Sequence, residues 1–218
     1  CVFLWNTEGY KDLKYVQLVD PIDHLYSVAA AFKPNFILNR FGFKETTKIT
    51  YFDYSKPALA YKRMLLEYWD GEDYPKFIDW ARKKFTINET AGTATENETM
   101  QDLWLREIEE WGSEKLIKNH WEFYKTLEHN YIYCDVCVNP EKFTNKVKNK
   151  GTQIIWWSNA FHTVNAHYLR GLQGVKKCYT EWISQLHDKN QNLYIMGKDY
   201  LNRPIEGGTL KEYLNENK

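Results

Sequence analysis

The chain has 218 residues and a mass of 26.1 kDa, and 43% of its residues are hydrophobic, which is enough for one large domain with a single core. It carries 29 basic and 29 acidic side chains, so its formal net charge is zero. This balance excludes a global field that would attract nucleic acid or an anionic membrane, although it leaves room for a local basic patch. The sequence contains no apolar run of about eighteen residues and no visible signal peptide, so we expect no membrane association.

The four cysteines predict a reducing, cytoplasmic environment. Cys134 and Cys137 fall within one predicted strand and its exit, which does not suit a disulfide framework. They form a CxxC pair, but the sequence offers no second pair and no histidines at metal-ligand spacing, so we assign no metal. One interpretation of the start at Cys1, instead of Met, is that the chain is part of a larger protein.

The first quarter of the chain predicts strands that alternate with a helix. VFLWNTEGY predicts a strand and a turn, followed by a second strand or a short helix. An almost continuous apolar run predicts a buried strand over 24–30, and helical spacing follows over 36–41, with Asn35 as the expected cap and Gly42 as the stop. Residues 48–53 form the next predicted strand.

The middle of the chain predicts helices and one loop. Ser55 is the expected N-cap of a helix that continues to about Tyr68. Another helix is predicted over 77–85, a mobile loop of small, polar and acidic residues follows, and a helical pattern then runs from 101 to 127. We expect the region of about 69–128 to be a helical and loop insertion within one domain that covers residues 1–218.

The last third returns to alternation. Strands are predicted over 131–138, 152–161 and 192–199, and helices over 141–150, 176–186 and 209–214. Strands separated by single helices are typical of βαβ units, whose strands are parallel and whose crossovers are right-handed. The sequence therefore predicts an α/β fold with a mainly parallel sheet.

Two apolar strands end at polar residues that are candidates for a site. The strand within ITYFDYS (49–55) ends at Asp53, and TQIIWWSNAF (152–161) turns polar at Ser158 and Asn159, shortly before His162. Open α/β sheets bind ligands at the carboxyl ends of their strands, which is where these residues are expected. A carboxylate there can accept two hydrogen bonds from a vicinal diol, Asn159 offers donors and an acceptor, and His162 can serve as a base. The alternatives are that Asp53 caps its own turn and that Asn159 ties down the following loop.

The ordered strand ends HLYSVAAAF, ITYFDYS, YIYCDV and IIWWSNAF resemble those of class I S-adenosylmethionine-dependent methyltransferases, over about residues 22–200. The resemblance implies a three-layer Rossmann-like fold with helices on both faces of the sheet. It also implies that Asp53, followed by Ser55 at a helix start, binds the ribose hydroxyls, and that Asp135 contacts the adenine amine. Ser158 and Asn159 would then lie near the methionine moiety and the acceptor, with His162 beside them; the acceptor itself is not implied.

The loop after the first matched strand departs from the family pattern. Where the family has glycines that approach the cofactor, this chain has Ala29, Ala30 and Ala31, of which Ala29 and Ala31 are the expected cofactor contacts. Each Cβ disfavours positive φ and narrows the expected pocket. Two alternatives therefore stay open beside a methyltransferase: a non-catalytic Rossmann-like binding module of a larger protein, and a sugar-nucleotide-dependent transferase.

Overall fold

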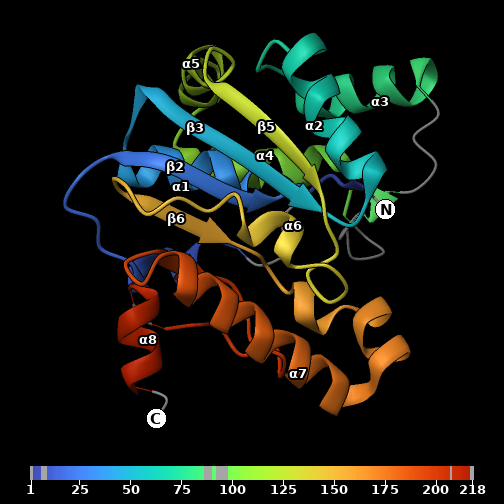
Figure 1. Ribbon diagram of the computed structural model, residues 1–218. Coiled ribbons are helices and arrows are strands. Elements are labelled where there is room, and N and C mark those ends of the chain that lie inside the picture. Colours follow the sequence, from blue (N-terminus) through green and yellow to red (C-terminus); the bar gives the residue numbers. More distant parts are fainter. Residues whose placement is uncertain (1, 6–8, 86–89, 92–97, 207, 217–218) are drawn as a thin grey trace.

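A sheet of five parallel strands lies at the centre of the computed structural model, which describes residues 2–5, 9–85, 90–91, 98–206 and 208–216 (Figure 1). In spatial order the strands are β5 (Glu128–Tyr133), β3 (Phe43–Asp53), β2 (Ile22–Val28), β6 (Gln153–Trp156) and β7 (Tyr194–Met196). The first strand of this sheet along the chain, β2, lies in the middle; β3 and β5 extend the sheet to one edge, and β6 and β7 then extend it from β2 to the other edge. This order places a topological switch point between β2 and β6, as in Rossmann-like folds.

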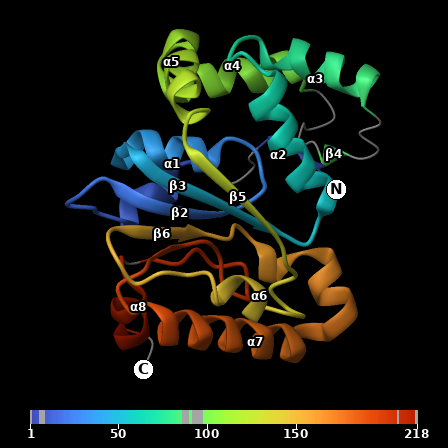
Figure 2. The ribbon, with the colours of Figure 1, turned by 45° about the horizontal axis from the view of Figure 1, so that its top comes forward.

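Helices cover both faces of the sheet (Figure 2). The first face carries α1 (Lys33–Phe41), α2 (Lys56–Tyr68), α3 (Tyr74–Lys84), α4 (Met100–Trp111) and α5 (Glu114–Tyr124). The second face carries α6 (Glu141–Thr144), α7 (Val164–Lys189) and α8 (Leu210–Glu216). The remaining elements are β1 (Val2–Phe3), which pairs in parallel with β4 (Thr90–Ala91), and the 3₁₀ helices η1 (Lys11–Tyr15) and η2 (Ala160–His162). The predicted α/β, three-layer Rossmann-like fold is confirmed.

The centre of the sheet, where β2, the second half of β3, β6 and β7 lie, is buried on both faces, which explains the near-continuous apolar runs in these strands. Along β6, alternate side chains point to opposite faces: Trp156 belongs to the core under α1 to α5, whereas Ile155 belongs to the core under α6 and α7. Leu25 and Tyr26 on β2 divide in the same way. Each core is rich in aromatic rings, so most tryptophans serve packing.

Several helix predictions differ from the structure. The helix predicted over 141–150 is shortened to Glu141–Thr144, and those predicted over 77–85 and 176–186 begin earlier, at Tyr74 and Val164. The pattern predicted over 101–127 is two helices, because Gly112 ends α4 with a φ of 90° and the Ser113 side chain caps α5. The helix α1 begins before its predicted cap: Phe32 is the N-cap residue, while the buried Asn35 side chain lies 3.3 Å from Nε2 of His120. Pro34 is tolerated in a first helical turn, so the Lys33-Pro34 pair starts the helix instead of stopping the strand.

Helices α3, α4 and α5 fall between β3 and β5, inside the region predicted as an insertion. The predicted loop after α3 lies mostly outside the described residues. Within the part of the chain that the structure describes, no helix is both long enough and apolar enough to span a bilayer.

Candidate functional site

A cavity of about 120 Å³ lies at the carboxyl edge of the sheet, beside the switch point. Strand register creates it: Val28 is opposite Phe52, Asp53 is opposite Tyr133, and Ser27 is opposite Trp156. The residues that follow these strand ends therefore meet at one edge. They include four of the eight predicted site residues, which all line the cavity: Asp53, Asp135, Ser158 and Asn159.

Asp53 is buried and hydrogen-bonded to two backbone amides. Its Oδ1 accepts from the Ser55 amide at 2.8 Å, and its Oδ2 accepts from the Ala29 amide at 3.1 Å. Burial raises the pKa of Asp53 to about 6, against the lowering effect of these hydrogen bonds. The bond to Ser55 is the turn cap considered from the sequence, and the bond to Ala29 joins β3 to the loop after β2. Both oxygens still have acceptor capacity, because a carboxylate can accept about four hydrogen bonds.

Ser55 and Ala29 support the Asp53 carboxylate from outside the cavity lining. Ser55 caps α2 as predicted, with its Oγ accepting from the Ala58 amide at 3.2 Å. Ala29 is buried, and Ala30, its neighbour, lines the cavity.

Ala31 adopts a positive φ of 27° although it is not glycine. This conformation is unfavourable for a residue with a Cβ, and surrounding contacts hold it. The Ala31 amide donates to the Phe3 carbonyl at 3.0 Å, and the buried Lys62 ammonium donates to the Ala31 carbonyl. The chain thus keeps a glycine-like bend at this point. Burial lowers the pKa of Lys62 to about 7.

Asp135 lies on the other side of the cavity, in the turn after β5. Its Oδ1 accepts from the Cys137 amide at 2.8 Å, and its Oδ2 lies 3.9 Å from Nη2 of Arg170. Cys134 and Cys137 flank it as free thiols. Burial raises the pKa of both thiols to about 12, so they are neutral near pH 7.

Ser158 and Asn159 form the sharp exit from β6. Ser158 has a φ of 55°, and its carbonyl accepts from the Lys198 amide at 2.7 Å, which ties this exit to that of β7. Its Oγ is 3.4 Å from Oδ1 of Asn159. The left-handed turn leaves both side chains at the cavity.

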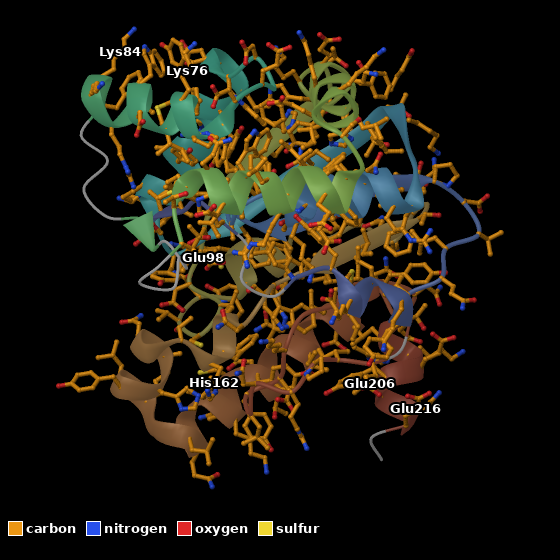
Figure 3. All side chains as sticks on the ribbon, turned by 180° about the vertical axis from the view of Figure 1, so that it is seen from behind. Lys76, Lys84, Glu98, His162, Glu206 and Glu216 are labelled. Atoms are coloured by element: carbon orange, nitrogen blue, oxygen red, sulfur yellow. The ribbon has the colours of Figure 1, made fainter. Side chains whose placement is uncertain are left out.

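His162 lies apart from this group. It is exposed at the end of η2 (Figure 3). Its ring centroid is 4.6 Å from that of His167. It is not among the described residues that line the cavity. Its role as a base stays a prediction.

The sequence patterns did not indicate three groups of residues that form or support the cavity. Phe3 and Trp5 line the cavity from the N-terminal segment, and Arg170 lines it from α7. Lys62 is the one for which a signal existed, because it sits among the apolar positions Leu59, Tyr61 and Leu65 of a buried helix face. Phe3, Trp5 and Arg170 are distant in sequence from the strand ends, and no local pattern marks them.

The described residues include no group of three His, Cys, Asp or Glu side chains that could hold a metal ion. No family model matches the chain, and no curated protein or solved structure shows significant similarity to it. The fold and the site define a Rossmann-like α/β protein with a mainly apolar cavity at its switch point, into which a few polar side chains project.

Proposed function

We propose that this chain binds a nucleoside-containing cofactor at the carboxyl-edge cavity, with S-adenosylmethionine as the leading candidate, and transfers its methyl group to an acceptor. The observation that carries the proposal is the convergence of Asp53, Asp135, Ser158 and Asn159 on one cavity at the switch point. These residues come from the exits of three different strands.

The chemistry of the two carboxylates suits a nucleoside. With a pKa of about 6, Asp53 is mostly ionised at neutral pH, and its oxygens retain acceptor capacity for the two hydroxyls of a ribose. Asp135 keeps an oxygen for an exocyclic amine, since its contact with Arg170 is as long as 3.9 Å. When bound, S-adenosylmethionine would supply an electrophilic methyl group, and Ser158 and Asn159 would orient the acceptor beside it.

Calorimetric titration with S-adenosylmethionine tests the proposal. We expect measurable heat and saturation at one site per chain. Absence of heat at millimolar ligand, with the fold intact by circular dichroism, would refute it.

The variant Asp53→Asn tests whether the carboxylate carries the binding. Loss of charge-assisted hydrogen bonds to a diol is expected to weaken affinity by about tenfold to a hundredfold. The matched control is Asp188→Asn, which removes the same charge from an exposed position near the end of α7. Equal affinity in Asp53→Asn and the wild-type chain would contradict the assignment.

A non-catalytic binding module is the second candidate, and cavity size favours it. About 120 Å³ is less than the roughly 300–1,000 Å³ typical of sites for drug-sized ligands. Phe3 and Ala30, joined by a β-bridge, form part of the wall. A ligand larger than one ring system must therefore extend out of the cavity or displace β1.

A thermal-shift series separates these candidates from a sugar-nucleotide-dependent transferase. A shift with S-adenosylmethionine favours the methyltransferase, and a shift with nucleotide sugars alone favours the sugar-nucleotide enzyme. No shift with either class favours the binding module.

A further inference from the structure

Arg170 brings an incompletely paired positive charge to the wall of the cavity. Its side chain is 19% exposed, and its Nη1 is buried with no hydrogen-bond partner among the described residues. Among the described residues, the contact recorded for its Nη2 is the long one of 3.9 Å with Oδ2 of Asp135. A buried guanidinium nitrogen without a partner is costly, so the arrangement calls for an additional acceptor.

The backbone of α7 holds Arg170 in this place. Helical geometry breaks at Gly171, whose φ of 61° and ψ of 174° separate the first turns of α7 from the rest. Figures 1 and 2 both show these orange turns bent away from the long part of the helix. Four residues later, Gly174 makes room for the arginine, since a Cβ there would lie 2.9 Å from the Arg170 Cβ. Two glycines thus shape the position of one side chain.

The neighbours of Arg170 in the cavity do not neutralise it fully. The Cys137 thiol beside it is uncharged near neutral pH because burial raises its pKa to about 12. Asp135 already accepts from the Cys137 amide, and its second oxygen is too far from Arg170 for a hydrogen bond. Asp53 is bound to the amides of Ala29 and Ser55.

We infer that Arg170 receives an anionic oxygen group, a phosphate or a carboxylate, of the molecule that enters the cavity. The planar fork of arginine suits both groups, since each can accept two parallel hydrogen bonds. The inference rests on the proposed function in that it takes the carboxyl-edge cavity as a ligand site. The anion has two possible sources: the carboxylate of S-adenosylmethionine, or an acidic group on the acceptor.

Titration with inorganic phosphate and with acetate, followed by the NMR signal of the Arg170 Nε–H group and by calorimetry, tests the inference. The variants are Arg170→Met, Arg170→Lys and, as matched control, Arg40→Met, which removes an exposed charge on α1. We expect phosphate affinity to fall at least about tenfold in Arg170→Met, to fall less in Arg170→Lys, and to stay unchanged in Arg40→Met. Thermal melting of each variant establishes that it is folded.

Asp135→Asn provides a readout that a purely structural role of Arg170 would not move. Removal of the carboxylate that competes for the guanidinium is expected to tighten phosphate binding. The inference would be overturned if Arg170→Met bound each anion as tightly as the wild-type chain does. It would also be overturned if the wild-type chain bound neither phosphate nor acetate.

To find the source of the anion, we compare the affinities of S-adenosylmethionine and of 5′-methylthioadenosine, which lacks the carboxylate, in the wild-type chain and in Arg170→Met. If the cofactor supplies the anion, Arg170→Met weakens binding of the first ligand only; if the acceptor supplies it, neither affinity changes and phosphate binding still depends on Arg170. Phosphate binding that depends on Arg170 without any S-adenosylmethionine binding leaves the inference standing and refutes the proposed cofactor. Binding of S-adenosylmethionine without any phosphate binding that depends on Arg170 refutes the inference and leaves the proposed cofactor standing.

Discussion

Lys62 offers the sharpest test of the energetics around the site. Its side chain is buried under the sheet, its ammonium donates to the Ala31 carbonyl, and the nearby charged or titratable groups include Asp53 and His129. Burial lowers its pKa from 10.5 to about 7. At about 1.4 kcal/mol for each pH unit between these values, burial of this lysine costs about 5 kcal/mol of folding free energy at pH 7 and below.

The variant Lys62→Met removes this cost together with the hydrogen bond. An unsatisfied Ala31 carbonyl costs about 1–3 kcal/mol, so we expect the variant to be more stable than the wild-type chain by about 2–4 kcal/mol at pH 7. At about pH 10 the folded chain holds a neutral lysine while the unfolded chain still holds a mostly charged one, so only about 1 kcal/mol of the cost of burial remains. The lost hydrogen bond, at about 1–3 kcal/mol, then matches or outweighs this cost, and the variant becomes the less stable of the two by up to about 2 kcal/mol.

Urea unfolding of both chains at pH 7 and at about pH 10 measures this reversal. The other titratable groups contribute almost equally to the unfolding free energies of the two chains, so their contributions cancel in the difference. Lys56→Met is the control: this lysine is exposed on the same helix, over the Tyr133 ring, and its loss should change stability by less than about 0.5 kcal/mol. A difference between Lys62→Met and the wild-type chain that does not vary with pH would refute the reasoning.

Three further outcomes follow from single contacts. Ser55→Ala removes the cap bond to the Ala58 amide and should lower the unfolding free energy by about 1 kcal/mol in urea; an unchanged midpoint would contradict the cap. Gly197→Ala places a Cβ 2.6 Å from Nε1 of the buried Trp157, at a φ of 147°, and should cost about 1–3 kcal/mol, measured as a lower melting temperature. Cys137, with its pKa raised to about 12, should react with a disulfide reagent at pH 8 far more slowly in the folded chain than in urea; equal rates would show an accessible thiolate.

Local patterns located the five strands of the sheet, although the strands predicted over 131–138 and 152–161 are Glu128–Tyr133 and Gln153–Trp156 in the structure. The apolar runs before Asp53 and Ser158 are strands whose last residues are buried, and the polar residues that follow them lie at the carboxyl edge of the sheet. The cap at Ser55 was also readable, because it depends on residues within one helical turn. Helix boundaries were predicted less well, although the signals that set them are local: Gly112 ends α4 and Ser113 caps α5, and Pro34 lies in the first turn of α1. The tertiary structure adds the buried contact of Asn35 with His120, which no local pattern indicates.

Asp53 separates what the sequence by itself determined from what only the tertiary structure decided. The chain alone placed this carboxylate at the end of a parallel strand, because hydrophobic periodicity and turn chemistry act over a few residues. Only the folded sheet put it against Ala29, brought Asp135 and Ser158 to the same cavity, and turned Arg170 toward them. The residues that line the cavity lie as far apart in sequence as Asp53 and Ser158. They meet because strand order and register, which depend on the packing of the whole chain, align the carboxyl ends of the strands at one edge.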